Sequence, residues 1–106
     1  MNYDLRDEYN LKKYMPDKHS LKNMTNFFHA FSDNTRLKII MLLSIKPLNV
    51  GEITNVLDIN QTTISHQLRI LKSLNIVSCD RAGKNVIYYI QNSSIENVLD
   101  ASVECI

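Results

Sequence analysis

The sequence of 106 residues predicts one mainly α-helical domain, with about five to six helices and a two-stranded β-hairpin near its C-terminal end. Several segments carry apolar residues every three to four positions, which is typical of amphipathic helices. Two helical segments that meet at Asp58 and Ile59 have the spacing of a helix-turn-helix. Two segments rich in β-branched and aromatic residues flank Gly83, which indicates a hairpin.

The first half of the chain is expected to form three helices. A weakly amphipathic helix over residues 3–14 presents Leu5 and Tyr9, and Pro16 with Asp17 ends it. Ser20 is the expected N-cap of the second helix, whose apolar residues are Leu21, Met24, Phe27, Phe28 and Phe31. Ser32 or Asp33 should cap the third helix. Its apolar run at 39–43 leaves little polar surface, so we expect it to be the central buried helix.

A helix-turn-helix is predicted over residues 50–74. Its first helix, Val50–Leu57, should direct Ile53, Val56 and Leu57 inward, and Asn60 should cap the second helix. The second helix carries a core stripe at i, i+4 and i+7, formed by Ile64, Leu68 and Leu71. Its opposite side, which we call the polar face, consists of Gln61, Thr62, Thr63, Ser65, His66 and Arg69.

The hairpin is predicted over residues 76–90, with Gly83 supplying a positive φ in the turn. Tyr88 and Tyr89 should lie on opposite faces of their strand. Ser93 or Ser94 is then expected to cap a last helix over 93–106, with Ile95, Val98 and Leu99 as its first apolar residues. A helix-turn-helix followed by such a hairpin, or wing, makes the whole chain a single winged helix-turn-helix domain.

The polar face could be a merely solvated surface, or it could bind DNA. Its side chains can bond base edges or phosphates, and the helix lacks the Glu/Lys pairs that are usual on a solvated helix. We expect Gln61, Thr62 and Thr63 to lie deepest in the major groove of double-stranded DNA. Ser65, His66 and Arg69 should contact bases or backbone one turn later.

The charge distribution favours the same interpretation. The net charge is only +1, but residues 60–90 carry +3 and residues 91–106 carry −3. As parts of an ordinary hairpin, Arg81 and Lys84 would be generic surface charges. Beside a DNA-binding helix they suit phosphate or minor-groove contacts. Lys72 joins them as a phosphate contact, and Arg69 adds to the same salt-sensitive affinity.

Other function classes find little support in the sequence. No basic-then-apolar leader and no apolar run of about 18 residues occurs, so we expect a cytoplasmic protein with no membrane partner. Ser65 and His66 are adjacent on one helix, so their side chains diverge and do not form a catalytic pair. No glycine-rich phosphate loop or cofactor motif is present, and the chain is expected to be neither an enzyme nor a cofactor-binding protein.

Three segments resemble the ArsR/SmtB family of repressors: Phe31–Ile39, Gln61–Leu68 and Gly83–Ile90, within a match over roughly residues 21–91. The resemblance implies a homodimer built from the first and last helices, here residues 1–20 and 93–106. It also implies a palindromic DNA operator and repression that an inducer relieves. The identity of that inducer is unknown from the sequence.

The metal-sensing positions of the family are not retained. Its cysteine-valine-cysteine motif falls on Asn49, Val50 and Gly51, which removes both thiolates. Its dimer-interface zinc site begins at Asn92 and Ser94, and a later histidine position falls near Cys105. Because a divalent ion needs about four suitable donors, we expect no metal at either place.

Two alternatives remain open at this stage. Cys105, near the chain end, could act as a redox switch together with Cys79, although Cys79 on a strand is also an ordinary small core residue. The winged helix could instead be a protein-protein interaction module that does not read DNA. Weak dependence of binding on salt would distinguish that module from a DNA-binding protein.

Overall fold

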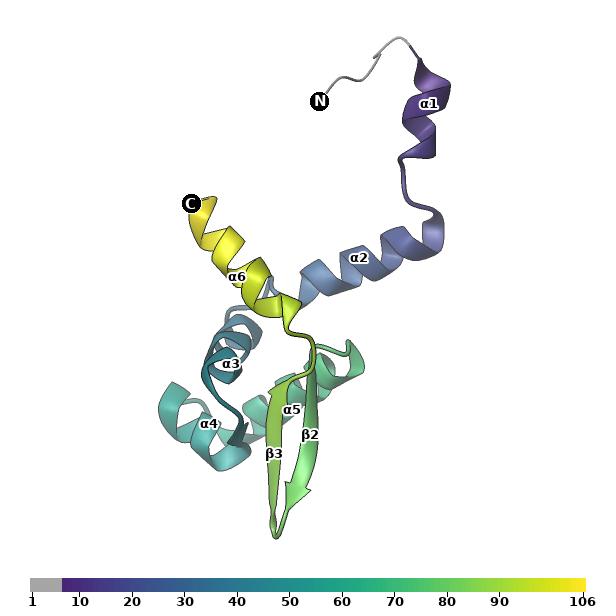
Figure 1. The fold of residues 1–106 in the computed structure, drawn as a ribbon. Helices are drawn as coiled ribbons and strands as arrows, with labels where there is room; N and C mark the ends of the chain where they lie inside the picture. The colour runs from purple at the N-terminus through teal and green to yellow at the C-terminus, as the bar shows by residue number, and fades with distance from the viewer. Residues whose placement is uncertain (1–6) are drawn as a thin grey trace.

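The structure is a computed structural model that describes residues 7–106, and it has a winged helix-turn-helix fold (Figure 1). Its described part contains six helices and three short strands. In chain order these are α1 (Glu8–Lys13), α2 (Lys18–Ala30), α3 (Asn34–Ile45), β1 (Leu48–Asn49), α4 (Val50–Leu57), α5 (Gln61–Ser73), β2 (Val77–Ala82), β3 (Asn85–Ile90) and α6 (Ser94–Glu104). The predicted fold class is therefore confirmed.

The hydrophobic core lies where α3, α4 and α5 meet the base of the hairpin. The predicted core stripe of α5 is confirmed, because Ile64, Leu68 and Leu71 are fully buried. Buried residues of the other elements surround this stripe: Ala30, Ile39, Ile40, Leu43, Leu48, Ile53, Ile76, Val77 and Ile95. Burial of one side of α5 leaves its other side free to face solvent.

The sheet has three strands, in the order β1-β3-β2, and not the two that the sequence predicts. The additional strand β1 pairs antiparallel with β3, with Leu48 opposite Tyr88 and Asn49 opposite Ile87. A strand of two residues is too short to show an alternating pattern in the sequence. Strand β1 is therefore recognised only from its pairing with β3. In the hairpin itself, Gly83 has a φ of +64°, as the turn prediction requires.

The helix caps follow the sequence at some positions and differ at others. Asp33 caps α3 and Asn60 caps α5, as predicted. The prediction for Ser20 is wrong: α2 begins at Lys18, and the Ser20 amide donates to Asp17 Oδ1 over 2.7 Å. A carboxylate is the stronger acceptor, and in accord with that bond the pKa of Asp17 is lowered, the Ser20 backbone hydrogen bond being the largest cause.

The start of α6 also differs from the expected serine cap. Ser93 occupies the N-cap position, but its side chain makes no capping hydrogen bond. Asn92 Oδ1 instead accepts from the Ser94 amide over 2.9 Å. The Asn92 side chain, and not a serine hydroxyl, therefore accepts the hydrogen bond from the first free amide of α6.

Two predictions of burial are wrong. Val56 is predicted to face inward but is 62% exposed, because α4 packs on the core through Val50, Ile53 and Leu57 on its other side. Helix α3 was expected to be buried on nearly all sides, yet Met41 is 52% and Ile45 is 78% exposed. Only one side of α3 faces the core, so its remaining apolar side chains stay on the surface of this single chain.

The N-terminal part projects from the body of the domain (Figure 1), and the molecule measures 60 × 29 × 21 Å. The expected helix over 3–14 lies partly outside the described residues; within them it is α1, capped by Asp7. Leu5 also lies outside them. Several large apolar side chains of this projecting part are exposed: Tyr9, Tyr14, Met15, Leu21, Met24 and Phe28.

Candidate nucleic-acid interface

Helices α4 and α5 form the helix-turn-helix. Asp58 ends α4 in the left-handed conformation, with φ of 54°, and its amide bonds the Thr54 carbonyl over 2.9 Å. A short polar side chain tolerates this conformation better than most residues do. Asn60 Oδ1 then accepts from the Thr63 amide over 2.8 Å and starts α5 in its new direction. The tight turn thus fixes how α5 is presented.

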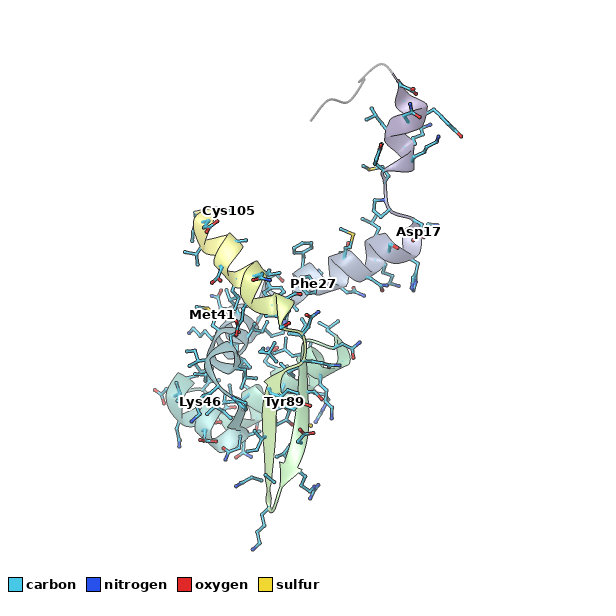
Figure 2. The ribbon with its side chains drawn as sticks, viewed as in Figure 1. Asp17, Phe27, Met41, Lys46, Tyr89 and Cys105 are labelled. Carbon is cyan, nitrogen blue, oxygen red and sulfur yellow. The ribbon has the colours of Figure 1, made fainter. Side chains whose placement is uncertain are left out.

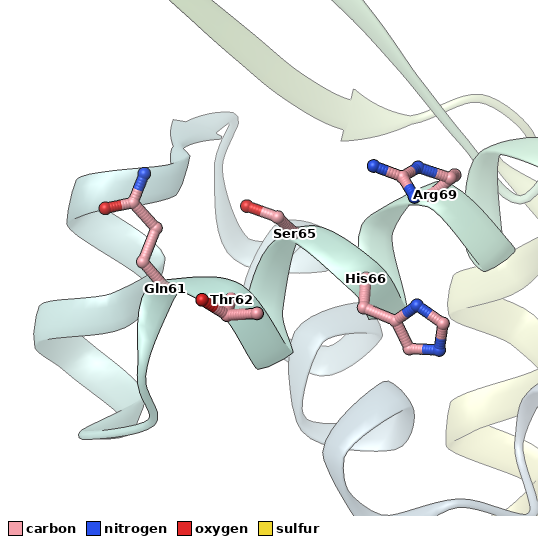
Figure 3. Close-up of a pocket in the computed structure, with 5 residues that line it drawn as sticks. All are labelled: Gln61, Thr62, Ser65, His66 and Arg69. Carbon is pink, nitrogen blue, oxygen red and sulfur yellow. The ribbon is translucent and has the colours of Figure 1, made fainter.

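Five residues of the polar face line one shallow depression of about 390 Å³: Gln61, Thr62, Ser65, His66 and Arg69. Figure 3 shows their side chains along one side of α5, with Gln61 at one end and Arg69 towards the other. Gln61, Thr62, His66 and Arg69 are exposed and Ser65 is half-buried. The sixth residue, Thr63, is half-buried and lies outside this lining.

The predicted phosphate contacts lie beside and beyond this depression. Arg81 is exposed on β2 and Lys84 is exposed in the turn at the tip of the hairpin. Lys72 stands in the last turn of α5, and its Nζ lies 3.3 Å from Cys79 Sγ on β2. Lys72 therefore marks the junction between α5 and the wing.

The two cysteines occupy different parts of the fold, and both are free thiols. Cys79 is half-buried on β2, opposite Tyr88. Cys105 is exposed just after α6, at the end of that helix that lies away from the wing (Figure 2).

Two residues at which the resemblance would place metal ligands, Asn49 and Asn92, make hydrogen bonds at helix starts instead. Asn49 and Glu52 form a reciprocal capping box at the start of α4, over 2.8 and 3.0 Å. Asn92 is used at the start of α6, as described above. Within residues 7–106, no three His, Cys, Asp or Glu side chains lie together in a way that could hold a metal ion. The same residues contain no helix long and apolar enough to cross a membrane.

Sequence reasoning assigned no role to Arg36 and Gln67, which the structure brings together. Arg36 Nη1 donates to Gln67 Oε1 over 3.2 Å, although the two residues are 31 positions apart. Arg36 stands in the first turn of α3, and Gln67 lies on α5 between the core stripe and the polar face. Spacing within one helix carries no signal for such a contact, so only the tertiary structure could reveal it.

Comparison with known proteins identifies the family. A family model described as "Bacterial regulatory protein, arsR family" matches residues 33–78. The cadmium resistance transcriptional regulatory protein CadC of Listeria innocua is 38% identical over 82 residues, which cover 76% of this chain and 69% of CadC. The transcriptional repressor SdpR of Bacillus subtilis is 40% identical over 72 residues, covering 68% of this chain and 79% of SdpR.

A solved structure shows the same fold. It is the solution NMR structure of a homodimeric winged helix-turn-helix DNA-binding domain, Mb0332 from Mycobacterium bovis, a possible ArsR-family transcriptional regulator. The TM-score is 0.76 at 24% identity, and the match covers 87% of each chain. With the helix-turn-helix, the wing and these relatives in agreement, the chain belongs to the arsR family of bacterial regulatory proteins, as a transcriptional regulator with a winged helix-turn-helix fold.

Proposed function

We propose that this regulator is a repressor that binds a palindromic DNA operator as a homodimer. The observation that carries the proposal is the arrangement of α5: one side supplies the buried core stripe, and the other presents the polar face to solvent. The repressor name of the relative SdpR supports the same direction of regulation.

The polar face supplies the means to discriminate bases. A glutamine amide can make two hydrogen bonds to the edge of adenine, and an arginine guanidinium can make two to guanine. Gln61 and Arg69 are therefore suited to base contacts. Thr62, Ser65 and His66 can each bond a base edge or a phosphate. Thr63 adds its hydroxyl at the start of the helix, beside the depression. A good bidentate base contact contributes about 1–3 kcal/mol of discrimination.

Cations at the edges of the polar face supply the affinity that does not depend on sequence. Lys72 at the α5–β2 junction, Arg81 on β2 and Lys84 in the turn are the proposed phosphate contacts. Each phosphate contact contributes a slope of about −0.9 in log K against log salt. Six such contacts in a dimer therefore give a slope of about −5.

The exposed apolar side chains of the projecting helices support the homodimer. Met24 and Phe28 on α2 and Val103 on α6 are 49%, 61% and 66% exposed in the single chain. We infer that residues 93–106 pair across the twofold axis with the N-terminal segment. On the N-terminal side the apolar surface extends beyond the expected residues 1–20, to Phe28. The two copies of α5 would then enter successive major grooves, about 34 Å apart.

The inducer is proposed not to be a metal bound at the family's usual positions. Asn49 caps α4 and the Asn92 side chain accepts from the Ser94 amide, and neither side chain is a thiolate, imidazole or carboxylate. The relative CadC is named for cadmium resistance, but the amide side chains of Asn49 and Asn92 do not support a response to a metal at these positions in this chain.

A gel-shift titration with DNA from the region upstream of this chain's own gene tests the proposal. Binding is measured at two salt concentrations, with an unrelated duplex of equal length as the control. The proposal predicts tight, salt-dependent binding to the upstream duplex and weaker binding to the control. Equal affinity for both duplexes, or affinity that salt leaves unchanged, would contradict it.

A further inference from the structure

The side chain of Arg36 connects three helices. Its Nε donates to the Ala30 carbonyl over 3.3 Å and its Nη2 donates to the His29 carbonyl over 3.0 Å, both at the end of α2. Its Nη1 reaches Gln67 on α5. The Arg36 backbone amide is held in turn by Asp33 Oδ2 over 2.9 Å. One half-buried guanidinium thus joins the last turn of α2 to the middle of α5 from the start of α3.

The guanidinium suits this position for a physical reason. The last carbonyls of a helix have no donor within the helix, and a cation near them is favourable for the helix dipole. The planar fork of Arg36 can meet two such carbonyls and still direct a third donor elsewhere, which a lysine ammonium on its flexible stem cannot reproduce in the same geometry.

Few other side chains fix the direction of α2 relative to α5. Phe27, Ala30 and Phe31, all in the last turn or just beyond it, are the residues of this helix that pack on or into the core. The remainder of α2 is exposed. Asn23 and Asn26 line a depression with the end of α5, and the N-terminal part of the helix points away from the body (Figure 1). A small change at this end of α2 is therefore magnified along the helix.

We propose that Arg36, acting through Gln67, is a positioning residue that sets the angle between α2 and the DNA-binding helix α5. Because α2 lies in the proposed dimer interface, that angle sets the distance and the relative orientation of the two polar faces. The inference rests on the proposed function, because it gives Arg36 a part in DNA binding without any contact to DNA.

Two variants separate this role from simple helix capping. Arg36→Lys keeps a cation for the α2 carbonyls but loses the bond to Gln67. Gln67→Met removes the acceptor at similar volume and leaves every charge in place. Gln67→Glu is the matched control, since a carboxylate still accepts from Arg36.

The first measurement needs no DNA. A spin label at Thr62→Cys, in a background with Cys79→Ser and Cys105→Ser, reports the distance between the two copies of α5 in the dimer. We expect a narrow distribution for the parent and for Gln67→Glu, and a broadened or shifted one for Arg36→Lys and Gln67→Met. Unchanged distributions in both variants would overturn the proposal.

The second measurement is affinity for the duplex from the chain's own upstream region. We expect each of the two variants to lose about tenfold, within the range typical of coupling between sites, with the salt slope unchanged because no phosphate contact is removed. The double variant should lose no more than either single one. If the two variants had a lower melting temperature but the same affinity for DNA as the parent protein, the role of Arg36 would be only structural and the inference would be overturned.

The two measurements also distinguish the inference from the proposed function. If the parent protein binds no DNA, the proposed function fails, and the spin-label distances still decide the role of Arg36. If Gln67→Met changes which bases are preferred, Gln67 touches DNA itself and the positioning role is wrong.

Discussion

Lys72 Nζ lies 3.3 Å from Cys79 Sγ, so the end of the DNA-binding helix and the wing strand meet through these two side chains. The thiol sulfur accepts from the ammonium, while the exposed position of Lys72 leaves its other two N–H donors able to reach a phosphate. The contact places a cation where the proposed base contacts end and the proposed backbone contacts begin.

Replacing Lys72 by glutamine should remove one phosphate contact in each protomer. Lys72→Gln is expected to make the slope of log K against log salt shallower by about 1.8 for a dimer. Cys79→Ser, which keeps an acceptor for the ammonium, is the control and should leave the slope unchanged. A parental slope in Lys72→Gln would show that this ammonium serves only the contact with Cys79.

Base reading and backbone binding should respond differently to substitution. Gln61→Ala is expected to relax sequence preference, by about 1–3 kcal/mol at the bases it contacts. Arg81→Ala should instead weaken binding to all sequences alike and flatten the salt slope. Affinities for a set of singly substituted duplexes at two salt concentrations check both. Identical behaviour of the two variants would show that their roles are assigned wrongly.

The cap of α5 should contribute measurably to stability. Asn60→Ala removes the acceptor of the Thr63 amide and is expected to lower the free energy of unfolding by about 1 kcal/mol. Asn55→Ala, at an exposed position of α4, is the matched control and should change it little. Urea unfolding at one fixed protein concentration measures both, because dimerisation makes apparent stability depend on concentration. Equal effects in the two variants would refute the capping role.

The core stripe of α5 should be far more sensitive than the exposed side of α4. Leu68 is fully buried, so Leu68→Ala is expected to cost about 2–5 kcal/mol of unfolding free energy. Val56, which is 62% exposed in the single chain, should tolerate alanine with a change of less than about 0.5 kcal/mol. Chemical unfolding gives both values. A large loss in Val56→Ala would reveal that a partner covers this side chain.

The cap of α2 makes a prediction for pH. The pKa of Asp17 is lowered from its ordinary value of 3.8, chiefly by the hydrogen bond from the Ser20 backbone amide. A lowered folded-state pKa contributes stability that is present above the unfolded pKa and is lost as pH falls through the folded one.

Asp17→Asn is the variant that tests this, because asparagine also caps helices but does not titrate there. The melting temperature of the parent protein should exceed that of Asp17→Asn near neutral pH, and the difference should shrink as pH falls below about 4. A difference that stays constant down to acid pH would contradict the role given to the carboxylate.

The sequence predicted the features that depend on neighbouring residues. The stripe of Ile64, Leu68 and Leu71 is visible because one helix repeats every 3.6 residues, and Asn60 stands where the periodic segment begins. The carboxylate of Asp17, directly after Pro16, is an equally local N-cap signal, and it caps α2 in place of the predicted Ser20.

Features that depend on distant partners could not be predicted. Strand β1 exists only because β3 lies beside Leu48 and Asn49. The bond between Arg36 and Gln67 crosses 31 positions. The exposure of Met41 and Val56 depends on which side of a helix the rest of the fold covers, and an apolar run does not specify that side.

A hydroxyl-radical footprint of the homodimer on its own upstream region tests the central claim most directly. Two copies of α5 in successive major grooves predict two protected blocks on one face of the duplex, about 10 base pairs apart from centre to centre. Gln61→Ala should weaken both blocks equally, since the two copies are related by symmetry. A single block, or no protected block at any protein concentration, would contradict the account.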